Sequence, residues 1–228
     1  MRAAFTTEVQ AIEADMQDQL ADASRTLTRL TPLIAQPSAR GAEALARTGR
    51  ALRARGREAD LRIVTLSATQ APVACDLRLV LTLMQIVQRQ GLIANQLMLI
   101  AEQLAEIDPT VIDRCGTTDK LTELARLACA QVERAAGAFI TRDPVACDRV
   151  CLGDDRLDQL NRQVCRTTLE MRLGPAQREL AFRHVLIARS LERIGDNAVD
   201  IARRTGELVK ADVHHLSHPS APALAAFG

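Results

Sequence analysis

Apolar residues recur along this chain at intervals of three, four and seven, which is the spacing of one buried helix face. The clearest series lies near the C-terminus and consists of Leu180, Ile187, Leu191, Ile194, Ala198 and Ile201. No stretch of the sequence alternates apolar and polar residues as a half-buried strand does. The pattern therefore predicts an all-α protein.

Proline and glycine divide this pattern into six long helices, which we expect at residues 7–32, 38–69, 72–106, 117–142, 145–172 and 174–212. A break at 108–116 separates the first three helices from the last three. Each half ends in a long helix that a proline opens, at the first-turn position where proline is tolerated. We therefore predict two tandem three-helix bundles packed side by side, at residues 1–109 and 115–213, and a disordered tail at 214–228.

Composition excludes several classes of protein. The 228 residues contain 29 Lys and Arg against 28 Asp and Glu, and only 2% are aromatic. A nucleic-acid-binding protein would show a basic excess, and its aromatic side chains would stack on bases. The most apolar stretch, residues 77–100, contains two arginines and four glutamines, so it does not resemble a bilayer span. We expect a cytoplasmic protein that neither inserts into membranes nor binds nucleic acid.

Six cysteines occur, and none forms a C-x-x-C pair. Cys147 and Cys151 are four residues apart and would share a helix face. They could form a thiolate metal site or a redox pair, or all six could be small buried thiols in a reducing cytosol. We favour the buried thiols.

Three carboxylates form a stripe on the last predicted helix. Glu192, Asp196 and Asp200 are each four residues apart, so they lie on one helix face. Like charges at this spacing destabilise a helix, which suggests that a cation compensates them. Carboxylate oxygens are the ligands of hard divalent cations and of iron.

A second acidic set, on the preceding predicted helix, consists of Asp154, Asp155 and Asp158. Two antiparallel helices would bring its i,i+4 pair, Asp154 and Asp158, towards the carboxylates of the stripe. The two sets would then supply four ligands to one cation or small cluster. The alternative is a solvated acidic face, partly neutralised by Arg189 and Arg193 at i,i+3 and i,i+4 positions.

Three segments, in this order along the chain, resemble the PhoU family. Residues 70–78 read QAPVACDLR, residues 154–160 read DDRLDQL, and residues 188–196 read ARSLERIGD, the last of which is the most specific. The resemblance covers about residues 1–213 and implies two PhoU three-helix repeats.

The resemblance also implies which residues hold a metal. In the second repeat they are Asp154, Asp158, Glu192 and Asp196, with Asp200 one turn further. The implied cofactor is iron, zinc, magnesium or manganese, at one site or cluster in the C-terminal repeat only. In the first repeat no carboxylate stands at the matching positions, which are Gly49, Arg53, Gly91, Asn95 and Leu99.

The function that this resemblance implies is regulatory. The protein would restrain phosphate transport and the phosphate-starvation response, through contacts with the ATPase of the phosphate ABC transporter and with the phosphate-sensing histidine kinase. It would be a homodimer, without catalytic activity, and would reach the inner face of the membrane only through its partners. Two alternatives are a metal-free helical adaptor and a carboxylate di-metal enzyme, although the Glu-x-x-His motif of di-iron bundles is absent from the sequence.

Two further features have competing interpretations. Six arginines crowd the second predicted helix between residues 47 and 62, at positions 47, 50, 53, 55, 57 and 62. They could form an anion- or partner-binding face that replaces the lost first site, or an exposed face whose stems cover apolar surface, which we favour. His184 stands eight residues before Glu192 and could join the acidic stripe, although we expect a core or surface histidine.

Overall fold

The computed structural model describes residues 2–111, 113, 116–152 and 155–217. The described residues form helices and contain no strand, which confirms the predicted all-α fold. The helices are α1 (Arg2–Ala35), α2 (Ala39–Gln70), α3 (Cys75–Ala105), α4 (Thr117–Thr141), α5 (Pro144–Cys151), α6 (Asp155–Glu170) and α7 (Pro175–Ser217).

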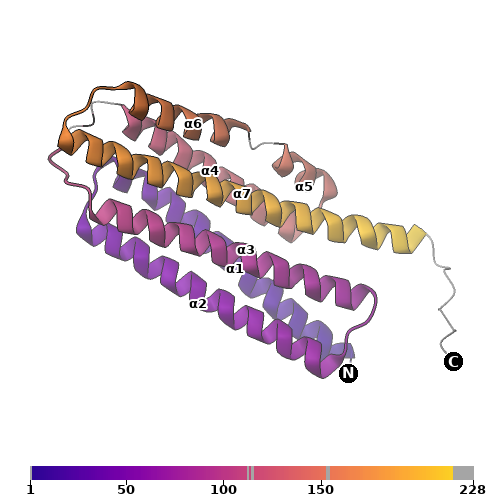
Figure 1. The fold of residues 1–228 in the computed structure, drawn as a ribbon. Helices are drawn as coiled ribbons and strands as arrows, with labels where there is room; N and C mark the ends of the chain where they lie inside the picture. Colours follow the sequence, from indigo (N-terminus) through magenta and orange to yellow (C-terminus); the bar gives the residue numbers. More distant parts are fainter. Residues whose placement is uncertain (1, 112, 114–115, 153–154, 218–228) are drawn as a thin grey trace, which may run out of the picture.

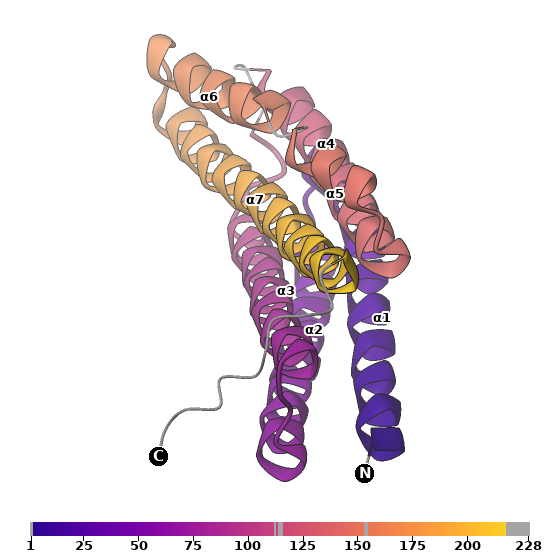
Figure 2. The same cartoon turned by 90° about the vertical axis from the view of Figure 1, so that its right-hand side faces the viewer.

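The helices pack lengthwise into one elongated bundle (Figure 1). α7 lies between α3 on one side and α4 on the other, as the end view in Figure 2 shows. α1 packs against α4, α2 packs mainly against α3, and α5 and α6 pack against α4 and α7. The two halves therefore meet along two helix pairs, α1 with α4 and α3 with α7. Their division into two repeats stays a prediction.

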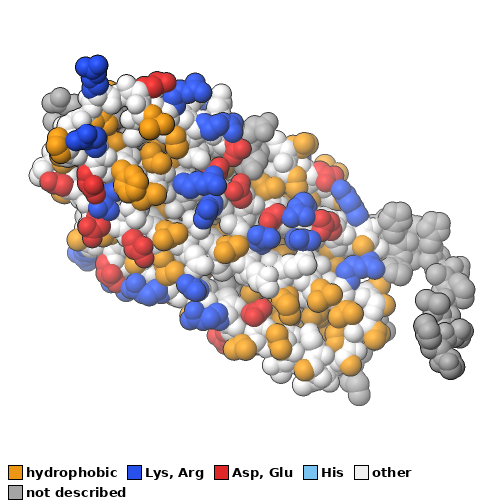
Figure 3. All heavy atoms as spheres, in the orientation of Figure 1, with side chains coloured by type: hydrophobic (Ala, Val, Ile, Leu, Met, Phe, Trp, Pro, Cys, Tyr) orange, Lys and Arg blue, Asp and Glu red, His pale blue; other side chains and the backbone are white. Residues whose placement is uncertain are grey.

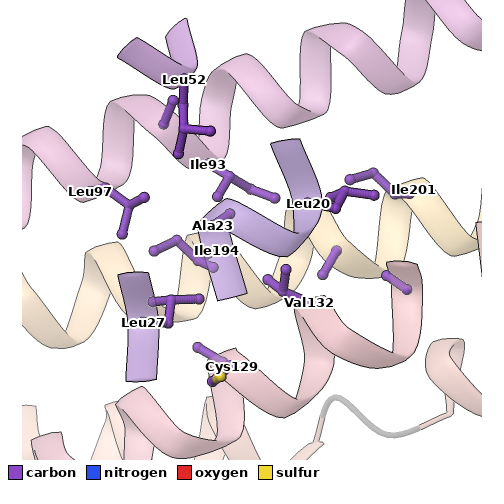
Figure 4. Close-up of a cluster of buried hydrophobic side chains, with 14 of the residues drawn as sticks. Leu20, Ala23, Leu27, Leu52, Ile93, Leu97, Cys129, Val132, Ile194 and Ile201 are labelled. Atoms are coloured by element: carbon purple, nitrogen blue, oxygen red, sulfur yellow. The ribbon is translucent and has the colours of Figure 1, made fainter. Parts of the chain in front are cut away.

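One buried hydrophobic cluster connects the two halves. Its centre, shown in Figure 4, brings together side chains from five helices: Leu27 of α1, Leu52 of α2, Leu97 of α3, Val132 of α4 and Ile194 of α7. Burial of apolar surface stabilises a fold by roughly 25 cal/mol per Å². The apolar faces read from the sequence thus converge on a shared core.

Capping residues explain where the helices begin. The Ser38 side chain accepts a hydrogen bond from the Gly41 backbone N–H at 3.2 Å, as an N-cap serine does. At the start of α4, Asp113 takes this role, because its Oδ2 accepts from the Thr118 backbone N–H at 2.7 Å. Its carboxylate thereby links the segment between the two halves to α4.

Several helix boundaries differ from the prediction. α1 begins at Arg2, before the predicted start at residue 7. α3 begins at Cys75, so Pro72 precedes this helix and does not open it, whereas Pro175 is the first residue of α7 as predicted.

α1 continues past Pro32 to Ala35, where the buried Ile34 still packs in the core. The single helix predicted at 145–172 is instead two, α5 and α6, and the sequence between them contains Gly153, a poor helix former. α7 continues to Ser217 because no proline or glycine stands between Gly206 and Pro219, so residues 214–217 of the predicted tail are helical. The rest of that tail, 218–228, lies outside the described residues.

None of the described helices has a segment long and apolar enough to cross a bilayer.

We expect Ile194→Ala to lower the free energy of unfolding by about 2–5 kcal/mol, because Ile194 is fully buried where α7 meets the other helices. Urea denaturation followed by circular dichroism measures this loss. The matched control is Leu169→Ala on α6, since Leu169 is 85% exposed and its truncation should change stability by less than about 0.5 kcal/mol. Equal losses in the two variants would contradict the central position of α7 in the core.

Candidate functional site

The acidic stripe lies on α7, along the edge of its buried face. Ile194 and Ile201 on the same helix are fully buried, whereas Asp196 is exposed. Glu192 and Asp200 have intermediate positions, with side chains 12% and 25% exposed. The stripe therefore faces solvent only in part, and desolvation strengthens its charge interactions.

Glu192 has a cationic neighbour on its own helix. Arg189 donates from Nη1 to Glu192 Oε2, three residues further along α7. This is the i,i+3 neutralisation that the spacing predicts. Glu192 thus has a guanidinium against one oxygen of its carboxylate.

Asp200 lies between two guanidinium groups. Arg203 donates from Nη2 to Asp200 Oδ1 at 2.6 Å, and this hydrogen bond raises the pKa of Arg203. Arg89 of α3 lies on the other side, with its Nε 3.2 Å from Asp200 Oδ2. Sequence reasoning missed Arg89, because it belongs to the other half of the chain and no local spacing connects it to the stripe. Figure 3 shows acidic and basic side chains together over the middle of α7.

The second acidic set is only partly described. Asp158 is on α6 with its side chain 40% exposed, and its Oδ2 lies 3.6 Å from Arg162 Nη1, one turn away. Asp154 lies outside the described residues, as do the side-chain surroundings of Asp155. The structure therefore does not test how the two acidic sets meet.

The described residues do not by themselves form a metal site. Among them, no group of three or more His, Cys, Asp or Glu residues comes close enough to hold a metal ion. Arginines instead lie against Asp158, Glu192 and Asp200. A site of the kind that the resemblance implies would need Asp154 in addition, so metal binding stays a prediction.

The corresponding positions of the first half come together between α2 and α3. Arg53, Gly91 and Asn95 line one hollow of about 410 Å³. Gly49, one turn before Arg53, packs so closely on α3 that a Cβ there would lie 2.6 Å from Met98 Cγ. Leu99 is 41% exposed. Three of the five positions thus border a common space, which carries a guanidinium and an amide in place of carboxylates.

His184 does not join the acidic stripe but lies in the core, as expected. Its side chain is 2% exposed, and its Nδ1 lies 2.8 Å from Thr117 Oγ1 at the start of α4. Thr117 in turn hydrogen-bonds to Asp113 Oδ1 at 3.2 Å. These contacts connect α7 to the segment between the two halves. Burial lowers the pKa of His184, although the negative charge of Asp113 acts in the opposite direction.

The prediction of buried thiols holds for only part of the cysteines, because Cys75 is exposed and Cys151 and Cys165 are half-buried. No described cysteine is in a disulfide, and Cys129 and Cys147 are buried. Burial raises the pKa of Cys147 to about 11 and also raises the pKa of Cys151. Both thiols are therefore protonated at neutral pH, which disfavours a thiolate metal site or a reactive redox pair.

We expect stability to fall as the pH drops below about 6.5, the ordinary pKa of histidine. Because the folded-state pKa of His184 is lowered, the unfolded chain binds the proton first, and protonation favours unfolding. The loss from this one group approaches about 1.4 kcal/mol per pH unit between its unfolded and folded pKa values. Urea denaturation between pH 5 and 8 measures it.

The control for this prediction is His184→Asn, whose Oδ1 can take the place of Nδ1 beside Thr117 but does not titrate. The variant should lose less stability than the wild type as the pH falls from 7 to 5. Identical pH profiles would show that His184 contributes nothing to the pH dependence.

Comparison with known proteins confirms the resemblance to the PhoU family. Residues 121–205, which include α6 and most of α4 and α7, match the family model described as PhoU domain. The chain is 26% identical over 209 residues to the phosphate-specific transport system accessory protein PhoU homolog 1 of Mycobacterium leprae, covering 90% of this chain and 91% of that protein. A corresponding homologue of Xylella fastidiosa is 32% identical over 91 residues, or 38% of each chain.

Solved structures share the fold over nearly the whole length. A crystal structure described as the phosphate transport system regulatory protein PhoU from Streptococcus pneumoniae has a TM-score of 0.80 and 17% identity, covering 90% of this chain and 96% of that one. PhoU from Pseudomonas aeruginosa has a TM-score of 0.73 and 21% identity, covering 91% and 96%. At these identities the likeness establishes the fold alone.

Proposed function

Because residues 121–205 form a PhoU domain and the chain is related along most of its length to phosphate-transport accessory proteins, we propose that it is a negative regulator of phosphate uptake. The relationship over 90% of the chain carries this proposal, since it extends well beyond the matched domain. The regulator would restrain phosphate import and the phosphate-starvation response when phosphate is plentiful.

The proposed mechanism is binding. The regulator would dock on the ATPase of the phosphate ABC transporter and on the phosphate-sensing histidine kinase, and would thereby hold both in a state of low activity. Binding of this kind needs a rigid surface and no catalytic group. The core shared by both halves supplies the rigidity, because side chains from five helices are packed together in it. A homodimer remains a further prediction.

An exposed apolar surface at one end of the bundle supports a docking role. Five large apolar residues, each at least 41% exposed, lie near the connection of α2 and α3; this apolar tip consists of Leu61, Val64, Val73, Leu77 and Leu81. Figure 3 shows hydrophobic side chains gathered at this end of the molecule. Exposed apolar patches of monomeric proteins commonly mark interaction sites.

A gene deletion tests the proposed function. Deletion in the native bacterium should raise phosphate uptake and the expression of phosphate-starvation genes in phosphate-rich medium, and the wild-type gene should reverse both. Leu77→Ser/Leu81→Ser should fail to reverse them, because it makes two exposed positions of the apolar tip polar without touching the core. Phosphate uptake and a starvation-promoter reporter provide the measurements.

The matched control is Leu152→Ser/Leu169→Ser, which replaces two leucines that are 83% and 85% exposed but lie away from the apolar tip. It should restore regulation fully. The comparison is valid when both variant proteins accumulate to the wild-type level and have the wild-type helix content. If the deletion leaves uptake and reporter unchanged in rich and in poor medium, the chain is not a phosphate regulator, and a helical adaptor with another partner is the better interpretation.

We also propose a metal in the C-terminal half, held by Asp154, Asp158, Glu192 and Asp196, with Asp200 one turn further. The spacing of these residues and the family resemblance support the proposal, whereas the arginines around the described carboxylates argue against it. The regulatory proposal does not depend on this metal.

Elemental analysis of the purified chain tests the metal directly. We expect iron, zinc, magnesium or manganese at close to one equivalent or more, removed by Glu192→Ala/Asp196→Ala. Asp18→Ala/Asp22→Ala on α1 removes two carboxylates at the same spacing and should retain the metal. A metal-free wild type with normal helicity would exclude the site and favour the metal-free adaptor.

A further inference from the structure

We infer that the hollow between α2 and α3 binds a small organic phosphate. This α2–α3 hollow has a volume of about 410 Å³. Small-molecule pockets typically have volumes of about 300–1,000 Å³. Gly91 opens it, because a Cβ added there would meet nothing within 4 Å. The hollow lies in the first half and is separate from the acidic stripe on α7.

Two arginines without partners supply the positive charge. Between positions 47 and 62 of α2, the other arginines all lie against carboxylates: Arg47 and Arg50 against Glu43, Arg55 against Asp15 and Asp22, and Arg62 against Glu8. Arg53 and Arg57 line the hollow, and within the described part of the chain neither has an ion pair or a hydrogen bond.

The spacing of these two arginines favours a shared anion. They are four residues apart on α2, where like charges on one helix face repel each other. A phosphate group between them would remove this repulsion. The guanidinium fork matches phosphate oxygens in geometry and donates two parallel hydrogen bonds.

The rest of the lining favours an organic phosphate over the bare ion. Asp60 also lines the hollow and would repel a bare anion, but its carboxylate would accept hydrogen bonds from ligand hydroxyls. Asn95 borders the same space, and its buried Oδ1 has no partner among the described residues, so it is a second acceptor in need of a donor. Val87 and Leu92 give the hollow an apolar part that a carbon skeleton would cover.

Two guanidinium groups in the same lining as two hydrogen-bond acceptors fit a hydroxylated phosphate monoester, such as a sugar phosphate. The hollow's volume also leaves room for more than a phosphate ion, since one water occupies roughly 30 Å³ in the liquid. This inference rests on the α2–α3 hollow alone and is independent of the proposed regulation of phosphate uptake.

Isothermal titration calorimetry of the full chain with ribose 5-phosphate, inorganic phosphate and ribose, at constant ionic strength, tests the inference. We expect ribose 5-phosphate to bind with a Kd below about 1 mM, inorganic phosphate to bind roughly tenfold more weakly, and ribose not to bind. Equal affinities for ribose 5-phosphate and inorganic phosphate would overturn the proposal of an organic ligand and would assign the hollow to the bare phosphate ion. If neither ribose 5-phosphate nor inorganic phosphate binds, the hollow is not a phosphate site.

Two variants assign the binding to this hollow. Arg53→Gln/Arg57→Gln should weaken ribose 5-phosphate binding at least roughly tenfold, because each charged hydrogen bond contributes about that factor. Gly91→Leu should block the hollow sterically and leave both arginines in place.

Each variant has a matched control on the same chain. Arg47→Gln/Arg50→Gln removes two exposed charges from α2 outside the hollow, and Gly137→Leu enlarges an exposed glycine of α4 that also faces open space. Both controls should bind as the wild type does. If they lose binding to the same extent, the attraction is non-specific and the site is wrong; circular dichroism and urea denaturation confirm that each variant is folded.

Discussion

The burial of α7 against α3 and α4 is the interaction on which the rest of this structure depends. α7 provides fully buried residues such as Ile187, Leu191 and Ile194, and they meet side chains from both halves of the chain. Because interiors are close-packed, this contact fixes the rotation of α7 about its axis. That rotation in turn sets the acidic stripe at the edge of the core and directs Asp200 towards Arg89 of α3.

Arginine forms most of the ion pairs described above. Carboxylates on α1 pair with Arg55 and Arg62, and arginines pair with Glu192 and Asp200 of the stripe. Partly buried pairs of this kind have a modest net effect on stability, because desolvation offsets much of the Coulomb attraction. Such pairs also fix the relative position of the helices that they join. Arg89 of α3 and Asp200 of α7, for example, connect the two halves beside the core. Arg53 and Arg57 have no such ion pair among the described residues, and the hollow that they line suggests a ligand.

The two halves differ in chemistry although both are built of helices that pack lengthwise. The second half matches the PhoU domain over residues 121–205 and carries the acidic stripe. In the first half, the corresponding positions line an open hollow with a guanidinium and an amide. Without carboxylates at these positions there is no mutual repulsion between them, and Arg53 places a positive charge there instead.

Periodicity and punctuation alone determined the all-α class and most helix boundaries, because apolar spacing and caps such as Ser38 act within a few residues. The i,i+3 spacing on one helix likewise predicted the ion pair between Arg189 and Glu192. Only the tertiary structure decided that Arg89 reaches Asp200, since that contact joins helices distant in sequence. Burial, too, depends on which faces meet, so the lowered pKa of His184 followed from packing and not from its position in the chain.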